Sequence, residues 1–223
     1  MIATKFLTAC AFAVAVFGAA STASAATLPV FGTGFLTDST TQVGDGALDG
    51  NWSVTSSPLG AFTPIAITPD GFPIPPWVAN DANSRWIGPA TDGDGSAPSG
   101  TYTYSQTFEI APGADTSLAF LEGQFAADDS ANMFLNGNLV ASTTGGFSAF
   151  TDYSITDFFI IGVNTLTVEV VNAGGSSQNP TGLRLSVLES FDGVTAVPLP
   201  AGILMLLGAL GITGVSCRKR AAA

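Results

Sequence analysis

The sequence lacks histidine altogether, and the stretch from Ala26 to Ala196 also lacks cysteine, since Cys10 and Cys217 lie outside it. Without histidine the chain has neither the usual general base and catalytic-triad partner nor the commonest zinc ligand. Without cysteine the central stretch can form no disulfide, thiolate metal site or cysteine nucleophile. These absences exclude most familiar hydrolytic and metal-dependent enzyme sites from it.

Basic residues are also scarce, and their distribution is uneven. Only two of the six, Arg85 and Arg184, lie between Ala26 and Ala196, whereas all 17 acidic residues do, which gives this segment a formal charge of −15. Two arginines cannot neutralise a phosphate backbone, so nucleic acid is excluded as a partner. The carboxylates either keep the protein soluble through mutual repulsion or bind divalent cations.

The N-terminal residues 1–25 have the pattern of a signal peptide. Lys5 provides a positive charge, residues 6–20 form an apolar run, and Ala23-Ser24-Ala25 has the small-x-small form of a cleavage site. We therefore expect the export machinery to act on the chain, and the mature protein to begin at Ala26. One exported domain, residues 26–196, is long enough to bury a sizeable core.

The C-terminal residues 197–220 consist of three parts in a fixed order. A stiff lead-in is followed by an uncharged apolar run from Ala201 to Cys217 and by the basic cluster Arg218, Lys219 and Arg220. The apolar run would form a helix about 25 Å long, at the short end of what spans a bilayer. The basic cluster would stay on the cytoplasmic side, with everything before Val197 outside. The lead-in is the short motif Val197, Pro198, Leu199, Pro200 and Ala201.

A short motif, a helix and a basic end resemble the PEP-CTERM sorting tail of bacterial exported proteins, in its VPLPA variant. The alternative is an ordinary membrane anchor, in which two prolines abutting the helix would have no purpose. The resemblance implies an exosortase-type membrane transpeptidase as a partner and cleavage near the motif. It also implies an intermediate held in the inner membrane, and a final location at the cell surface or in the extracellular matrix.

The exported segment has the sequence pattern of an all-β fold. Strands are expected around residues 30–36, 51–56, 84–87, 102–110, 118–125, 147–155, 165–172 and 182–188, and Asn136-Gly137 suits a tight hairpin turn within residues 131–142. The proline-rich residues 58–76 are expected to form a loop, with any strand at a sheet edge. No window has a helical apolar stripe, so we predict an antiparallel jelly-roll β-sandwich, flanked by the signal peptide and the transmembrane sorting helix.

A second resemblance rests on the order of six short stretches. They are SRWI, YTYSQTF, FAADDSANMFLNG, GFSAF, GVNTLTVEVVN and TGLRLSV, between Ser84 and Val187. This order is similar to that of the galactose-binding-like jelly roll, which occurs in exported PEP-CTERM proteins and as an accessory module of glycoside hydrolases. The resemblance implies a β-sandwich and favours contact with polysaccharide, but it transfers no binding residue.

Two groups of carboxylates are candidate metal ligands, with calcium as the candidate cofactor. Asp128 and Asp129 are adjacent and could offer oxygen ligands to one ion. Asp92 and Asp94 begin a loop like that of a calcium site, although Ala97 and Thr103 stand where an EF-hand has glycine and glutamate. The alternative for both groups is an ordinary solvated turn.

Aromatic side chains are the candidate sugar-binding residues, because the apolar face of a sugar stacks on an aromatic ring. The candidates are Trp77, Trp86 and Tyr102, with Trp52 and Tyr104 as further possibilities. Trp52 and Trp86 lie in short strands and favour the core. Trp77 follows Pro75-Pro76 and is the candidate exposed ring.

The sequence thus leaves three functional hypotheses open. The first, which it favours, is a structural or adhesive surface or matrix protein that is not an enzyme and contacts exopolysaccharide. The second is a calcium-dependent carbohydrate-binding module, and the third is a glycan-active enzyme, since glycosidases need only two carboxylates. No motif singles out a catalytic pair.

Overall fold

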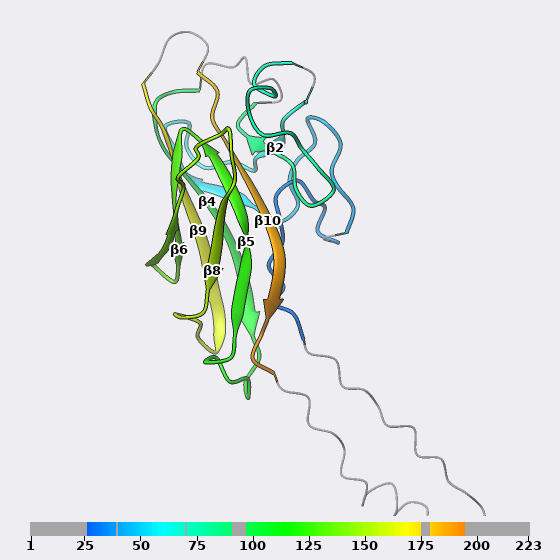
Figure 1. Ribbon diagram of the computed structural model, residues 1–223, viewed down its shortest axis with the longest axis vertical. Helices are drawn as coiled ribbons and strands as arrows, with labels where there is room; N and C mark the ends of the chain where they lie inside the picture. Colours follow the sequence, from blue (N-terminus) through cyan, green and yellow to red (C-terminus); the bar gives the residue numbers. More distant parts are fainter. Residues whose placement is uncertain (1–25, 39, 70, 91–96, 175–178, 195–223) are drawn as a thin grey trace, which may run out of the picture. The chain divides into compact units, whose positions relative to one another are not determined.

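The structure is a computed structural model that describes residues 26–38, 40–69, 71–90, 97–174 and 179–194. Within these residues the regular structure is β-strand alone, in two five-stranded antiparallel sheets that form a β-sandwich (Figure 1). The sequence-based prediction of an all-β sandwich is therefore confirmed. The expected signal peptide and the expected sorting tail lie outside the described residues, and among the residues described no helix is long and apolar enough to cross a membrane.

The first sheet has the strand order β1-β4-β9-β6-β7. Its strands are β1 (Ser53–Ser56), β4 (Gly100–Ile110), β9 (Gly162–Asn172), β6 (Ser130–Leu135) and β7 (Asn138–Ser142). β4 and β9 pair along their whole length, from Gly100 opposite Asn172 to Ile110 opposite Gly162. The expected hairpin turn joins β6 to β7, with Asn136 and Gly137 at φ angles of 50° and 81°.

The second sheet has the order β2-β3-β10-β5-β8. Its strands are β2 (Ile65–Ala66), β3 (Ile87–Gly88), β10 (Gly182–Phe191), β5 (Phe120–Asp128) and β8 (Thr151–Ile155). The short β2 lies within the proline-rich residues 58–76 and at the edge of the sheet, as predicted. A bulge between Val187 and Glu189 interrupts the pairing of β10 with β5.

The main core lies between the two sheets. It is built from the side chains that alternate inward along the long strands, including Tyr102, Phe125, Leu166, Leu183 and Leu185. Each of these residues is fully buried. Within one strand the inward residues are two positions apart, as Leu183 and Leu185 are, because side chains alternate between the two faces of a β-strand. Hydrophobic burial between the sheets therefore fixes the register of both.

The strand expected at residues 30–36 does not form. This segment instead crosses β10, where the Thr33 N–H donates to the Leu185 carbonyl at 2.9 Å. The Gly34 N–H donates to the carboxylate of Asp49 at 2.6 Å, and Asp49 also accepts from the N–H groups of Asn51 and Trp52. A buried carboxylate thus binds backbone donors that a neighbouring strand would otherwise satisfy.

Candidate functional site

The segment between β2 and β3 packs against the outer face of the second sheet and forms a second, smaller core. This core consists of Ile67, Ile74, Trp77, Trp86 and Ala126. The two indole rings lie 4.3 Å apart between centroids, at an interplanar angle of 43°. A Cβ atom at Gly182 would lie only 2.9 Å from the Trp77 ring, so the glycine allows the indole to lie directly on β10.

The expectation that Trp77 is an exposed ring is wrong, because only 3% of it is exposed. The backbone N–H of Trp77 donates to the Pro73 carbonyl at 2.8 Å, so the proline-rich loop folds back and turns the indole inward. Trp86 is fully buried, as the core interpretation predicted, and Tyr102 is fully buried between the sheets. None of these three rings presents a face on which a sugar could stack.

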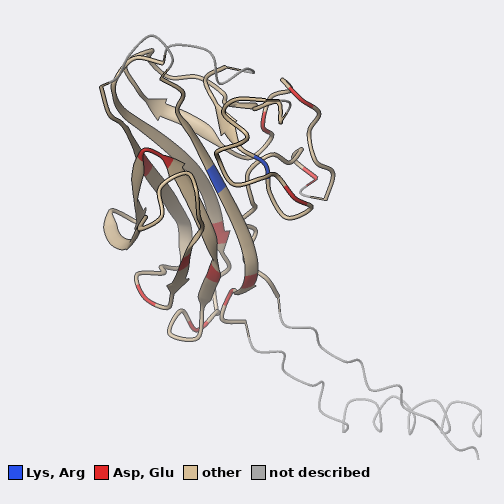
Figure 2. Cartoon of the chain, turned by 45° about the horizontal axis from the view of Figure 1, so that its top comes forward, with Lys and Arg blue, Asp and Glu red and all other residues tan. Residues whose placement is uncertain are grey.

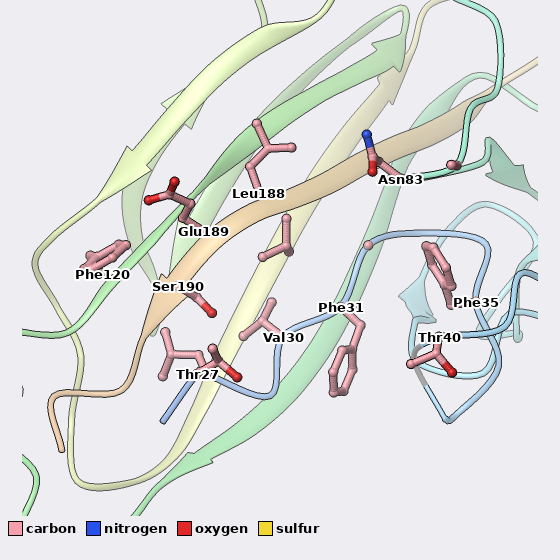
Figure 3. Close-up of a pocket in the computed structure, with 14 residues that line it drawn as sticks. Thr27, Val30, Phe31, Phe35, Thr40, Asn83, Phe120, Leu188, Glu189 and Ser190 are labelled. Atoms are coloured by element: carbon pink, nitrogen blue, oxygen red, sulfur yellow. The ribbon is translucent and has the colours of Figure 1, made fainter. Parts of the chain in front are cut away.

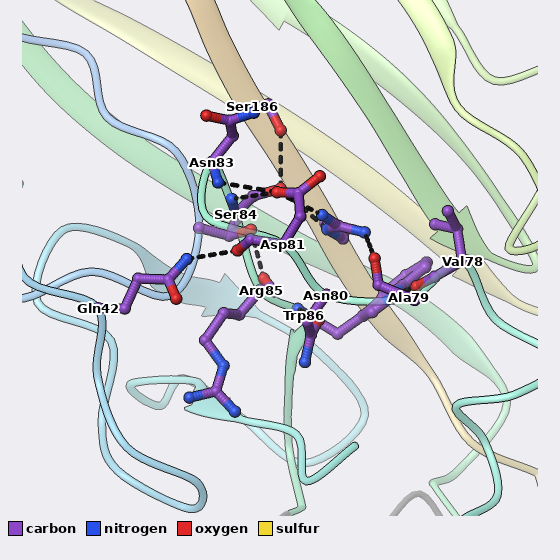
Figure 4. A network of polar contacts seen from close by, with 12 residues as sticks. Gln42, Val78, Ala79, Asn80, Asp81, Asn83, Ser84, Arg85, Trp86 and Ser186 are labelled. Atoms are coloured by element: carbon purple, nitrogen blue, oxygen red, sulfur yellow. Dashed lines mark hydrogen bonds and ion pairs between the residues drawn. The ribbon is translucent and has the colours of Figure 1, made fainter.

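Arg184 bonds to three residues of the covering segment, namely Ala79, Asp81 and Ser84, which Figure 4 labels within a network of polar contacts. Its side chain is fully buried on the outer face of β10. The Nε atom donates to the Ser84 hydroxyl at 2.9 Å, Nη1 donates to the Ala79 carbonyl, and Nη2 forms an ion pair with Asp81 at 2.8 Å. The Phe150 ring lies 4.7 Å from the guanidinium carbon. Arg184 lies on the face of β10 opposite to Leu183 and Leu185, because side chains alternate along a strand, but the covering segment removes it from solvent.

Asp81 links this arginine to the turn that precedes β3. Its carboxylate accepts from the N–H groups of Asn83 at 2.8 Å and Ser84 at 3.1 Å. Partial burial works to raise the pKa of Asp81, but the bond from Asn83 and the charge of Arg184 outweigh it and hold that pKa below its usual value. Asp81 therefore stays ionised opposite the buried cation.

Asp128 ends β5 beneath the same covering segment. It is 5% exposed, and its backbone carbonyl accepts from the Thr181 hydroxyl at 2.9 Å. Burial, together with the charge of the adjacent Asp129, raises the pKa of Asp128 to about 7. A carboxyl group in this setting favours its neutral form, which makes it a poor calcium ligand without further oxygens.

Asp129 lies beside the carboxyl group of Asp128 and is exposed at the surface. Its carboxylate accepts from the Ala173 N–H at 2.7 Å, as expected for a carboxylate that stabilises a turn. No group of three or more acidic, histidine or cysteine side chains in the described part of the chain could hold a metal ion. The other two candidate ligands, Asp92 and Asp94, lie outside the described residues.

Two surface hollows flank the end of β10 and share Leu188 and Glu189. The larger, about 670 Å³, lies between β10 and the N-terminal segment and is lined by Phe31, Asn83 and Phe120 among others (Figure 3). The smaller, about 530 Å³, is lined by Glu122, Asp152 and Ser154. We call the two together the β10 groove. It lies beside the bulge at which Leu188 turns outward, with 55% of it exposed.

The β10 groove offers hydrogen-bonding groups beside the partly exposed rings of Phe31 and Phe120. Glu122 stands directly opposite Glu189 in the strand register, an arrangement of like charges that weakens strand pairing. The Ser154 hydroxyl donates to Glu122 at 2.8 Å. Carboxylates and hydroxyls of this kind can accept hydrogen bonds from sugar hydroxyls or attract cations.

The sequence analysis missed the groove. Its members come from the N-terminal segment, the segment between β2 and β3, and strands β5, β8 and β10, which are far apart in the chain. The bulge that turns Leu188 outward interrupts an alternating pattern, and such a break is the one local signal that could have indicated it.

No family model and no curated protein matches the chain. Among solved structures, it is similar to an FMN-binding beta-glucuronidase from Facaelibacterium prausnitzii L2-6, with 24% identity over 62% of this chain and a TM-score of 0.36. A family 35 carbohydrate binding module from an environmental isolate matches 48% of this chain and 76% of its own, with 11% identity and a TM-score of 0.26.

A beta-glucosidase from Kluyveromyces marxianus matches 42% of this chain, with 18% identity and a TM-score of 0.27. The chain spans 21% of the length of the glucuronidase and 12% of that of the glucosidase. At these TM-scores the similarities carry no argument about ligand or activity.

The buried carboxyl of Asp128 makes the stability of the domain depend on pH. Its pKa is about 7 in the folded protein against an ordinary value of 3.8. The folded state therefore holds a proton that the unfolded state releases, and stability falls as pH rises from about 4 to about 7. Above that range the loss is complete, on the order of 2 kcal/mol once the solvent that still reaches the group is allowed for.

Replacing Asp128 by asparagine removes this loss, so D128N should unfold at higher urea concentration than the wild-type protein at pH 8. The two should have equal stability near pH 4. D129N removes the neighbouring charge but leaves Asp128 buried, so it should recover part of the difference. Urea titrations at several pH values measure all three, and identical pH profiles for wild type and D128N would contradict this account.

Proposed function

We propose that this protein is an exported, non-catalytic surface or matrix protein. In this proposal the export machinery removes residues 1–25, and an exosortase-type transpeptidase recognises the tail at residues 197–220 while its helix lies in the inner membrane. The domain then reaches the cell surface or extracellular matrix and contacts exopolysaccharide as a structural or adhesive component. We also propose that its sandwich is a jelly roll of the galactose-binding-like kind.

The observation that carries the proposal is the charge of residues 26–196, which contain 17 carboxylates and only two arginines. The two arginines of the exported segment both form ion pairs within the domain, Arg85 with Asp45 and Arg184 with Asp81. Figure 2 shows the two basic positions within the body of the domain and acidic positions spread over strand ends and loops. A strongly anionic surface without a free cation favours dispersion in a hydrated matrix over tight binding to an anionic polymer.

The β10 groove is the part of the described surface best suited to polysaccharide contact. The buried rings of Trp77, Trp86 and Tyr102 favour a role for hydrogen bonding over stacking. A neutral glycan would bind directly through the carboxylates and hydroxyls of the groove. An acidic glycan would need a calcium ion between its own carboxylates and those of the groove, and we propose that calcium binds in this way.

The sorting step is testable in the producing cell with a change confined to the motif. P198A/P200A should leave the tail helix intact but abolish recognition, so that uncleaved protein accumulates in the inner-membrane fraction. P112A, an exposed proline in a loop of the domain, is the matched control. Fractionation and the mass of the mature chain provide the readout, and normal processing of P198A/P200A would contradict the proposal.

The polysaccharide contact is testable by calorimetry with residues 26–194 and the exopolysaccharide of the producing organism, in calcium and in EDTA. We expect saturable binding that E122Q/E189Q weakens about tenfold or more, because hydrogen bonds to charged groups are lost. E109Q, on the other sheet, is the control. No heat in either buffer from a folded domain would reject polysaccharide binding and leave a structural role.

A further inference from the structure

The loop between β8 and β9 carries an apolar patch at one end of the sandwich. The patch extends from Phe158 in this loop to Val163 at the start of β9, and four of these six residues are exposed, with exposed fractions of 49% for Phe158, 51% for Ile160, 47% for Ile161 and 63% for Val163. Single exposed apolar residues are common on protein surfaces, but a contiguous group usually marks an interaction site. We call Phe158, Ile160 and Ile161 the apolar tip.

Two asparagines, of which Asn164 is buried and Asn136 is partly exposed, hold the apolar tip in place. The side chain of Asn164 is fully buried and accepts from the Ile160 N–H at 2.9 Å, while its amide donates to the Ile160 carbonyl at 2.7 Å. Asn136, from the β6–β7 turn, donates to the Phe158 carbonyl at 2.9 Å and to Asn164 at 2.8 Å. The neighbouring Phe159 is only 7% exposed and contacts Phe108 edge to face.

Phe158 itself has a φ angle of 68°, in the left-handed region that bulky side chains rarely adopt. A conformation of this kind costs free energy and persists only where its surroundings impose it. Here the surroundings turn Phe158 outward and Phe159 inward. The loop is therefore built to present apolar side chains to the outside.

The apolar tip lies at the end of the domain from which the chain leaves toward the tail. Gly162 pairs with Ile110, and the loop that follows Ile110 reaches Gly193, where the Asp115 N–H donates to the Gly193 carbonyl at 3.0 Å. The Asp192 N–H in turn donates to the carbonyl of Ala26 at 3.2 Å. Both ends of the described domain are thus at this end of the sandwich (Figure 1).

We propose that the apolar tip rests on the outer surface of the membrane while the tail is still attached. This inference rests on the proposed function, because it needs the tail helix to lie in the bilayer. Val194 is seven residues before Ala201, so the connection spans at most about 25 Å. Such a tether holds this end of the domain at the lipid surface, where exposed phenylalanine and isoleucine side chains can enter the headgroup region.

The charge near the tip indicates which lipids suit it. Asp157 precedes Phe158, and Asp115 and Asp192 lie at the same end of the domain. These carboxylates repel anionic headgroups. The surface that fits is therefore zwitterionic, and the docking holds the tail motif close to the membrane plane, where a membrane-embedded transpeptidase would meet it.

The test uses residues 26–223 with C217S, reconstituted into phosphatidylcholine–phosphatidylethanolamine vesicles. One cysteine, I160C or L59C, carries an environment-sensitive fluorophore. Leu59 is a matched control, since 53% of it is exposed. It follows Pro58, which contacts Gly100 at the opposite end of β4, about 30 Å from Ile110.

On vesicles that carry the protein, the probe at position 160 should shift to the blue and be quenched by spin-labelled lipid, and the probe at position 59 should do neither. Phosphatidylglycerol should reduce the shift at position 160. Equal signals at the two positions on protein that floats with the vesicles would overturn the docking alone. A shift at position 160 without vesicles that grows with protein concentration would indicate a contact between copies and overturn it too. Failure to float would instead reject the membrane-anchored tail.

Discussion

The guanidinium of Arg184 is the interaction on which the closed form of this domain depends. A β-sandwich usually leaves the outer face of each sheet to solvent, yet here a long excursion between β2 and β3 covers one outer face. A buried cation is costly unless it is paired and hydrogen-bonded, and Arg184 has hydrogen bonds to Ser84 and Ala79 and an ion pair with Asp81, all within that excursion. The arginine of the sheet and the polar groups of the covering segment between β2 and β3 are therefore each other's bonding partners.

The cover explains where functional surface remains. It buries Trp77, the ring that the sequence favoured for an exposed sugar-binding position, together with Trp86, and both belong to the second core. What the cover leaves open is the β10 groove, with its opposed Glu122 and Glu189. The two surfaces that we propose for interaction, the β10 groove and the apolar tip, both lie where the pairing or the backbone departs from regular strand geometry.

Much of the sandwich could be predicted from local pattern. Alternation identified β9 and β10, and Asn136-Gly137 identified the turn between β6 and β7, because both signals depend on neighbouring residues only. The burial of Trp77 could not be predicted, since it depends on Gly182, more than a hundred residues away, having no side chain to oppose the indole. The burial of Arg184 and the position of residues 30–36 depend in the same way on contacts distant in sequence.

The central claim, that this cover is held on the sheet by Arg184, is tested most directly by the stability of R184M. Methionine keeps the apolar stem but leaves the hydroxyl, carbonyl and carboxylate partners without their donor. Urea unfolding of residues 26–194, followed by tryptophan fluorescence, should show a loss on the order of 3 kcal/mol, with the tryptophans more accessible to acrylamide before unfolding. Unchanged stability and unchanged shielding of the tryptophans would contradict the claim that Arg184 holds the covering segment on the sheet.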